Sequence, residues 1–122
     1  MTWPHTESVI DKNFSVGAQS FSSYKINVPK GASGVKLSGQ FGTSSSGDIE
    51  VYLLTDDAFV DWRNGFATRT FYDSGRVAEG KFEAELPRGA GAYYLIFSNK
   101  FSRRQAATVQ ASATLHYHLW WP

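Results

Sequence analysis

Hydrophobic and polar residues alternate with a period of two along most of this chain. Such alternation is typical of β-strands that turn one face to a hydrophobic core and the other to water. Glycine, serine and proline separate the alternating stretches at a spacing of roughly ten residues, which favours an all-β sandwich or barrel. The predicted strands cover residues 10–16, 24–28, 35–41, 49–53, 67–75, 82–86, 92–99 and 108–119.

Two of these stretches are especially informative. In residues 108–119 every odd position is apolar or aromatic and every even position is polar or histidine. In residues 92–99 both sets of positions are largely apolar, as in Leu95 and Ile96. A strand that is apolar on both faces is expected at the centre of a packed sheet.

Only residues 56–65 suggest a helix. Ala58, Phe59 and Trp62 stand at helical spacing, and Asp56 or Asp57 could cap the helix. We expect this turn to carry the chain from one sheet to the other.

A second turn is expected at Asp73-Ser74-Gly75, where it would close the strand of residues 67–75. Together the elements predict an all-β fold: an antiparallel two-sheet β-sandwich, jelly-roll-like, with about eight strands and one short helical crossover. We interpret residues 1–122 as a single domain.

Composition narrows the class of protein. The 122 residues include no cysteine, which excludes disulfides, thiolate zinc sites and a cysteine nucleophile. The net charge is +1, and only Arg103 and Arg104 form an adjacent basic pair, so we expect no nucleic-acid partner. No apolar run reaches the roughly 18 residues of a membrane helix. Residues 1–10 lack the basic and apolar regions of a signal peptide, and the compartment is left open.

Asp61, Trp62, Arg63 and Asn64 form the first candidate binding site. Trp62 could stack on a sugar or anchor a partner, with the three polar residues supplying hydrogen bonds at its rim. Alternatively, Trp62 plugs the end of the sandwich while the polar residues solvate the crossover, and this second interpretation is favoured.

Trp120 and Trp121 form the second candidate site. They would point to opposite faces if the last strand continues, so at most one can join the core. The other could cover a sheet edge, contact Trp3, or present an exposed aromatic ring to a partner or a second copy.

Metal sites have weaker support. Asp48, Asp56 and Asp57 offer oxygen ligands for calcium, but Asp48 and Asp56 would lie about 25 Å apart along one extended strand. His116 and His118 share a strand face and could bind zinc with His5 or a carboxylate as third ligand. We predict no metal and no cofactor.

The remaining polar groups have ordinary explanations. Lys100, Arg103 and Arg104 form a basic loop that could meet phosphate or an acidic protein, although such loops often serve solubility. Glu83 and Glu85 face solvent from one strand. The chain has no nucleophile-elbow serine motif, phosphate-binding glycine loop or HExxH motif, so we predict that it is not an enzyme.

Seven segments together resemble the GOLD domain, the Golgi-dynamics β-sandwich of early-secretory cargo receptors, Sec14-like lipid-transfer proteins and bacterial GOLD-like modules. They span residues 21–115 and read Y-x-I-x-V-P-x-G, V-x-L-x-G-x-F, G-D-I-E-V-Y-L, F-V-D-W-R-N-G, Y-D-S-G, G-x-Y-Y-L-I-F-S-N-K-F-S and V-Q-A-S-A-T-L. The resemblance implies a non-catalytic sandwich that binds proteins or lipid-associated partners. The chain lacks the paired cysteines, coiled coil and membrane anchor of the cargo receptors, which favours a stand-alone module.

Our leading hypothesis is a non-enzymatic interaction module that engages a protein or lipid-associated partner through a sheet face or loop end. The alternatives are a carbohydrate-binding jelly-roll module and a structural subunit of a homo-oligomer. The candidate binding residues are Asp61, Trp62, Arg63, Asn64, Trp120 and Trp121.

Overall fold

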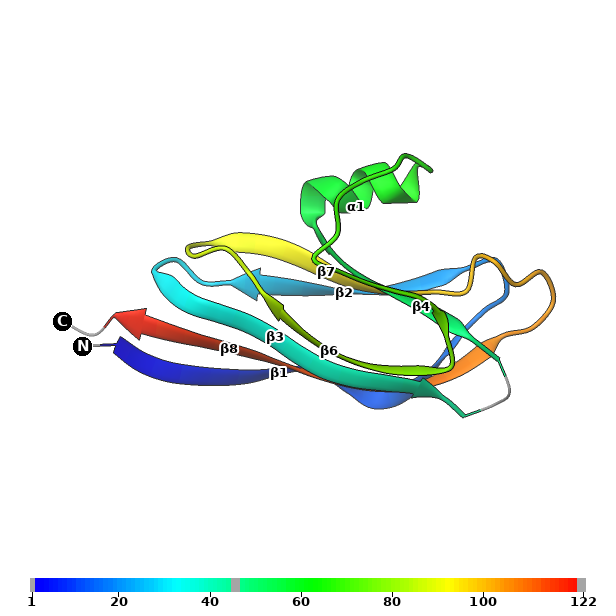
Figure 1. Ribbon diagram of the computed structural model, residues 1–122, viewed down its shortest axis with the longest axis horizontal. Helices are drawn as coiled ribbons and strands as arrows, with labels where there is room; N and C mark the ends of the chain where they lie inside the picture. Colours follow the sequence, from blue (N-terminus) through cyan, green and yellow to red (C-terminus); the bar gives the residue numbers. More distant parts are fainter. Residues whose placement is uncertain (1, 45–46, 121–122) are drawn as a thin grey trace.

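The chain folds into two four-stranded antiparallel sheets that face each other, as the computed structural model shows (Figure 1). The structure describes residues 2–44 and 47–120, with only the backbone described for Thr2 and Trp120. In chain order the elements are β1 (Thr2–Val16), β2 (Phe21–Val28), β3 (Ala32–Thr43), β4 (Ile49–Thr55), α1 (Asp56–Arg63), β5 (Tyr72–Val77), β6 (Glu79–Glu85), β7 (Gly91–Ser98) and β8 (Ala107–Trp120).

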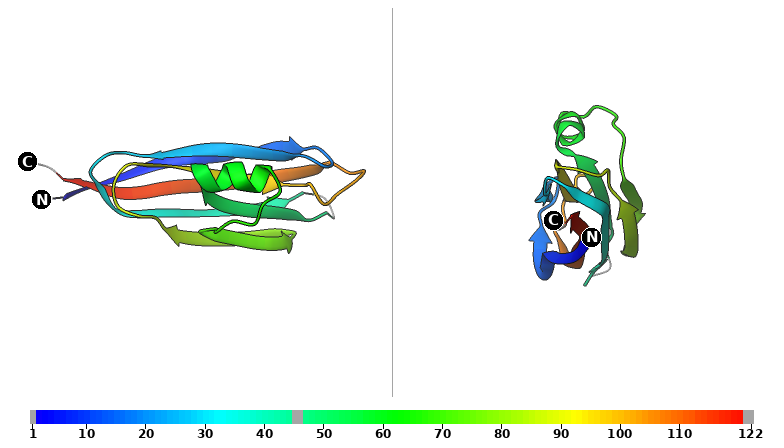
Figure 2. Two further views of the ribbon diagram at one scale, coloured as in Figure 1. Left: turned by 90° about the horizontal axis from the view of Figure 1, so that it is seen from above. Right: turned by 90° about the vertical axis from the view of Figure 1, so that its left-hand side faces the viewer.

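The strand order is that of a jelly roll. One sheet has the order β1-β8-β3-β6 and the other the order β2-β7-β4-β5. The first four strands therefore pair in reverse with the last four: β1 with β8, β2 with β7, β3 with β6 and β4 with β5. This is one long hairpin wrapped into two layers, visible end-on in Figure 2, and it confirms the predicted β-sandwich.

The core lies between the sheets and follows the predicted alternation. Val51, Leu53, Leu95, Phe97 and Leu115 are almost completely buried there. Burial of such side chains stabilises the fold by roughly 1.5–3 kcal/mol for each one removed from water. The alternation predicts that all five side chains face inward. This prediction needs only the order of residues within each strand, because successive side chains of a strand point to opposite faces.

Helix α1 explains why β7 is apolar on both faces. The helix lies on the outer face of the β2-β7-β4-β5 sheet, on the side away from the core (Figures 1 and 2). There it covers Leu54 and Ile96, which are fully buried. The described residues include no helix long and apolar enough to cross a membrane.

The predicted crossover between sheets is wrong, because α1 joins β4 and β5, which are neighbours in one sheet. The predicted cap is also wrong, because Thr55 occupies the N-cap position and its side-chain oxygen accepts a hydrogen bond from the Ala58 amide at 3.0 Å. Asp56 and Asp57 instead occupy the first turn, where their charge favours the positive end of the helix dipole.

The strand predicted for residues 67–75 begins only at Tyr72, and Asp73-Ser74-Gly75 forms a β-bulge inside β5 rather than a turn after it. Asp73 accepts a hydrogen bond from the Gly75 amide at 2.9 Å, and Ser74 Oγ accepts one from the Val51 amide at 2.8 Å. Gly75 has φ +64°, which a glycine adopts without strain. These turn-forming residues therefore bend a strand that continues past them.

Strand β1 is longer than predicted and forms an edge of its sheet. Its register against β8 shifts between Ser8 and Ile10, so Val9 is an extra residue in the ladder. Lys12 lies opposite Ala111, a core residue, and its ammonium sits 5.1 Å from the centre of the Tyr24 ring. An inward-pointing lysine on an edge strand is held here by a cation–π contact.

Candidate functional site

An aromatic cluster joins α1 to the sheet beneath it. Phe59 stacks on Tyr94 with 4.4 Å between ring centres, and Trp62 meets Phe21 edge to face at 5.0 Å. Tyr52 lies under Trp62 at 5.7 Å. We call these five side chains the α1 cluster; they make the helix a fixed part of the sheet face.

Two cations close the rim of the α1 cluster. Lys100 Nζ lies 4.5 Å from the centre of Trp62 and 5.4 Å from that of Phe21, and the Arg63 guanidinium lies 5.2 Å from the centre of Phe59. Lys100 comes from the loop after β7, which the sequence does not reveal as a neighbour of Trp62. The ring faces of Trp62 and Phe59 are therefore partly occupied by the protein's own charges.

Tyr52 holds a polar contact at the base of the cluster. Its hydroxyl donates a hydrogen bond to the Glu50 carboxylate at 2.8 Å. Burial, followed by this hydrogen bond and the Glu50 charge, raises the pKa of Tyr52 well above its usual value. The hydroxyl therefore keeps its proton to higher pH than a free tyrosine, and its hydrogen bond to Glu50 holds the ring beside Trp62.

The structure places the four residues of the first predicted site on different sides of α1. Trp62 is half-buried and packs on the outer face of the sheet, so the interpretation that it plugs the end of the sandwich is wrong. Asp61, Arg63 and Asn64 are exposed, and Asn64 is the C-cap of the helix. Because adjacent helical residues point about 100° apart, Asp61 and Arg63 leave the helix in other directions than Trp62. Their binding role stays a prediction.

Exposed apolar side chains gather in the same part of the chain. Among the described residues, four large hydrophobic side chains are exposed: Trp3 (54%), Val60 (44%), Phe66 (68%) and Phe71 (38%). Three of them lie in residues 56–71, which we call the α1–β5 segment. The exposure of two of them can be predicted from the sequence. If Phe59 and Trp62 face the sheet, helical geometry turns Val60 away from it, and Phe66 lies beyond the end of the helix.

The second predicted site lies at the other end of the molecule. Trp120 ends β8, and its backbone pairs with Thr2 of β1, while Trp121 lies outside the described residues. Trp3 pairs with Leu119 and therefore shares its face of the sheet. Both chain ends leave the same tip of the molecule, at the left in Figure 1.

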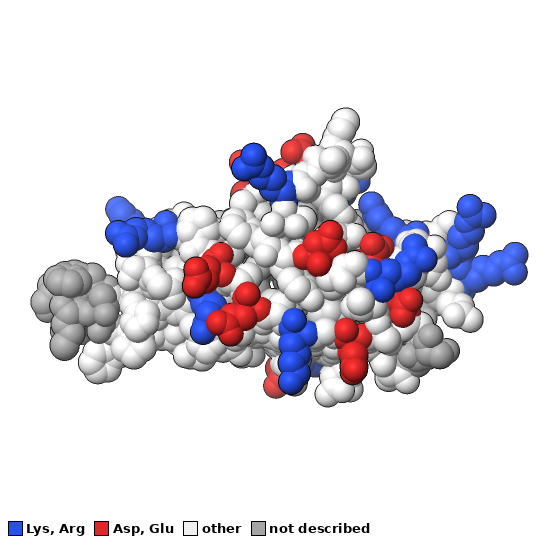
Figure 3. Space-filling model, viewed as in Figure 1, with Lys and Arg blue, Asp and Glu red and all other residues white. Residues whose placement is uncertain are grey.

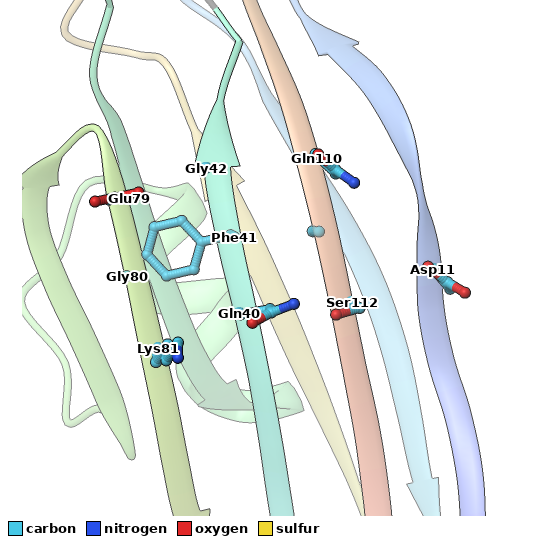
Figure 4. A pocket seen from close by; sticks show the side chains of 10 residues that line it. Asp11, Gln40, Phe41, Gly42, Glu79, Gly80, Lys81, Gln110 and Ser112 are labelled. Carbon is cyan, nitrogen blue, oxygen red and sulfur yellow. The ribbon is translucent and has the colours of Figure 1, made fainter.

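The outer face of the β1-β8-β3-β6 sheet carries a hollow of about 650 Å³ that crosses all four strands (Figure 4). A second hollow of about 540 Å³ adjoins it and shares Gln40, Lys81 and Ser112. We call the two together the polar trough. The sequence carries no local signal for the polar trough, because its lining comes from four strands that are distant along the chain.

The histidines do not gather into a metal site. His5 pairs with Tyr117 in the β1–β8 ladder and stacks on its ring at 5.2 Å, whereas His116 and His118 lie on the opposite face of the sheet. Within residues 2–44 and 47–120, no group of three His, Asp or Glu side chains could hold a metal ion.

A serine–histidine contact exists but lacks the other parts of a hydrolase site. Ser38 Oγ lies 3.1 Å from His116 Nε2. No carboxylate of the described residues hydrogen-bonds the second ring nitrogen of His116 to orient it. Ser38 also sits within β3 between β6 and β8, whose ladders occupy the backbone amides that an oxyanion hole would need.

Charges are distributed over the rest of the surface. Acidic and basic side chains are interspersed over the face seen in Figure 3, and basic ones gather at the end that carries the loop of residues 99–106. Arg103 and Arg104 are exposed there, and Arg76 lies over the Phe101 ring at 4.0 Å. The loop itself is fixed by the buried Asn99.

No family model matches the sequence, and no curated protein matches it. The fold is similar to that of a protein from Bacillus endospore appendages, which form disulfide-linked pili, with a TM-score of 0.58 and 13% identity. That alignment covers 98% of this chain and 92% of the other.

Two further solved structures are similar. A periplasmic inhibitor of g-type lysozyme from Aeromonas hydrophila aligns with a TM-score of 0.52 and 9% identity, over 91% of this chain and 86% of that one. The VP2 subviral particle of infectious bursal disease virus aligns with a TM-score of 0.51 and 13% identity, over 97% of this chain but 33% of that one. At these identities the likeness shows a shared β-sandwich fold.

Proposed function

We propose that this protein is a non-enzymatic interaction module that binds a protein partner through the α1–β5 segment. The observation that carries the proposal is the exposure of Val60 on α1 and of Phe66 just after the helix, which is anchored to the sheet by the α1 cluster. Exposed apolar side chains on a rigid support are typical of protein interaction sites. Asp61, Arg63 and Asn64 would supply the polar rim, and Trp62 the support.

A site-specific photocrosslinking experiment tests this proposal. A photoreactive phenylalanine analogue at position 66 should capture a discrete partner from an extract of the source organism. The same analogue at Lys30, an exposed residue between β2 and β3 that belongs to neither candidate surface, is the control. With the captured partner purified, Val60→Ser should weaken binding about tenfold, because a buried anchor at an interface contributes on the order of 1–2 kcal/mol. Equal capture at both positions, or none at position 66, would contradict the proposal.

The resemblance to the GOLD domain supports the same class of function. It would extend the partners to lipid-associated proteins, for which the basic loop of residues 99–106 is the natural contact. Binding to liposomes that contain anionic lipid, with loss on Arg103→Glu and Arg104→Glu, would support that extension.

Self-assembly is a second candidate function. Trp3 is the exposed aromatic residue at the tip where both chain ends leave, next to the end of β8 that carries Trp120. Among the similar structures, the endospore appendages form disulfide-linked pili and the VP2 structure is that of a subviral particle, although this chain has no cysteine and cannot form disulfide-linked assemblies. Sedimentation at rising concentration should show an oligomer that Trp3→Ser dissociates, and a monomer throughout would exclude it.

A further inference from the structure

The polar trough owes its shape to the lengths of the side chains that face outward. On the two central strands some of these are short or absent, as with Ser112 of β8 and Gly42 of β3, whereas Gln40 and Gln110 are long. On the edge strand β6 they are long, as with Glu79 and Lys81. Short residues between longer ones leave a depression along the middle of the sheet.

The residues in the trough form an ordered row. Asp11 lies opposite Ser112, Ser112 opposite Gln40, and Gln40 opposite Lys81, so one polar side chain from each strand stands in line. Strands are spaced at about 4.8 Å, so the row is about 14 Å long. The trough therefore suits an extended ligand rather than a single small molecule.

The hydrogen-bonding groups of the trough are available. Gln40, Gln110 and Ser112 line it and make no side-chain hydrogen bond to any other residue that the structure describes. Each of them can both donate and accept a hydrogen bond, as a sugar hydroxyl can. Because they project from paired strands, the backbone positions from which they extend are fixed before a ligand arrives.

The lining also excludes several ligand classes. The rings of Phe41 and Phe82 lie on the core side of the sheet, so an apolar ligand would find little surface to bury. Asp11 and Glu79 face the trough together with Lys81, and this excess of carboxylates repels phosphate and other polyanions.

We propose that the polar trough binds an uncharged, polyhydroxylated chain, namely a neutral oligosaccharide, through hydrogen bonds to Gln40, Gln110 and Ser112. The flanking carboxylates of Asp11 and Glu79 accept hydrogen bonds from further hydroxyl groups of the sugar. The sugar rings contact no aromatic face in this trough, so binding leaves tryptophan fluorescence unchanged. This site is independent of the α1–β5 segment and of the proposed protein partner.

The test is a titration of nitrogen-15-labelled protein with neutral hexasaccharides of glucose, xylose, mannose and N-acetylglucosamine, followed by amide correlation spectra. At least one sugar should cause saturable shifts of the Gln40 and Gln110 side-chain amides and of the Ser112 backbone amide. The double variant Gln40→Ala, Gln110→Ala should bind that sugar about tenfold more weakly, because it loses two neutral hydrogen-bonding groups.

Two further variants make the result specific. Asn27→Ala removes an exposed amide from the outer face of the other sheet and should leave the affinity unchanged. Ser112→Ile should abolish binding by filling the floor of the trough, while the spectrum of each variant reports its fold directly. Saturable shifts with none of the four sugars, equal affinity of the double variant, or a response to spermine but to no sugar would overturn the proposal.

Discussion

At the scale of single residues, Asn99 shows how one buried polar group can organise a loop. Its side chain is only 2% exposed, and its Nδ2 donates to the carbonyl oxygens of Val16, Gly17 and Gln105 at 3.2, 3.3 and 2.8 Å. The loop after β7 is thereby tied to the end of β1. Since Lys100 belongs to this loop, the same amide helps to hold the Lys100 ammonium over Trp62.

We expect Asn99→Ala to lower the free energy of unfolding by about 2–4 kcal/mol, because it leaves three carbonyl groups without their donor. Denaturation in urea measures the change. Asn27→Ala, at an exposed position, is the matched control and should change stability by less than about 0.5 kcal/mol. A cost below about 1 kcal/mol for Asn99→Ala would mean that water replaces the amide at no loss.

The raised pKa of Tyr52 predicts a pH dependence of stability. In the unfolded chain the phenol ionises near its ordinary pKa of 10.0, whereas in the folded protein burial and Glu50 keep it protonated to higher pH. Above about pH 10 the unfolded state therefore binds fewer protons than the folded state, and stability falls as pH rises. Tyr52→Phe should make the alkaline fall in unfolding free energy shallower, as denaturant titrations at neutral pH and at alkaline pH would measure.

Tyr52→Phe also removes the hydrogen bond to Glu50, so we expect a cost of about 1 kcal/mol at neutral pH. Glu50→Gln is the companion variant, because it removes the charge and keeps a side chain that can accept the hydrogen bond. An alkaline profile identical in the wild type and Tyr52→Phe would show that Tyr52 does not contribute to the fall.

At the scale of elements, α1 is held by a few contacts on one side. Phe59 is its buried residue, and it touches Tyr94, Trp62 and Phe21. An eight-residue helix is too short to be stable alone in water, so its docking on the sheet maintains it.

Phe59→Ala should therefore destabilise α1 by about 3 kcal/mol while the two sheets remain folded. Native-state hydrogen exchange would detect this as faster exchange of the α1 amides, with those of β8 unchanged. Val60→Ala, one residue away and exposed, is the control and should leave α1 protected. Uniform acceleration of exchange in both elements would show that α1 and the sandwich unfold as one unit.

The elements also show which features follow from local sequence. The inward positions of β8 and the double-sided character of β7 are predictable, because they depend on the order of apolar residues within one strand. The bulge at Asp73-Ser74-Gly75 is not, because the same residues end a strand in one context and bend it in another. The cap at Thr55 escapes prediction because the neighbouring aspartates are equally good caps, and only the position of the first helical residue distinguishes them.

The candidate sites, too, are only partly predictable from local sequence. Trp62 stands out from its local surroundings, but its partners Phe21 and Lys100 come from β2 and from the loop after β7. The polar trough depends on the register of four strands. The sequence shows that its residues are polar and face outward, but it does not show that the four strands lie side by side.

At the scale of the whole molecule, the jelly roll brings the two chain ends together. Thr2 and Trp120 are opposite each other in the β1–β8 ladder, and the largely exposed residues 65–71 form a long connection elsewhere. A circular permutant that joins the ends through a short glycine–serine linker and opens between Ala67 and Thr68 should fold.

We expect this permutant to unfold within about 2 kcal/mol of the parent, since it keeps every strand pair. Far-ultraviolet dichroism and urea denaturation measure fold and stability. A permutant opened between Leu95 and Ile96, inside the central strand β7, should fail to fold and serves as the control. Failure of the first permutant would contradict the pairing of β1 with β8.

Lys12 has a consequence for how copies of this protein behave when crowded. A strand from a sister molecule that approached β1 would have to set a side chain beside this ammonium, and Val9 would put the two backbones out of step. Amyloid-like stacking is therefore discouraged along this border. Copies that associate along this border must therefore meet through their side chains rather than through a shared β-ladder.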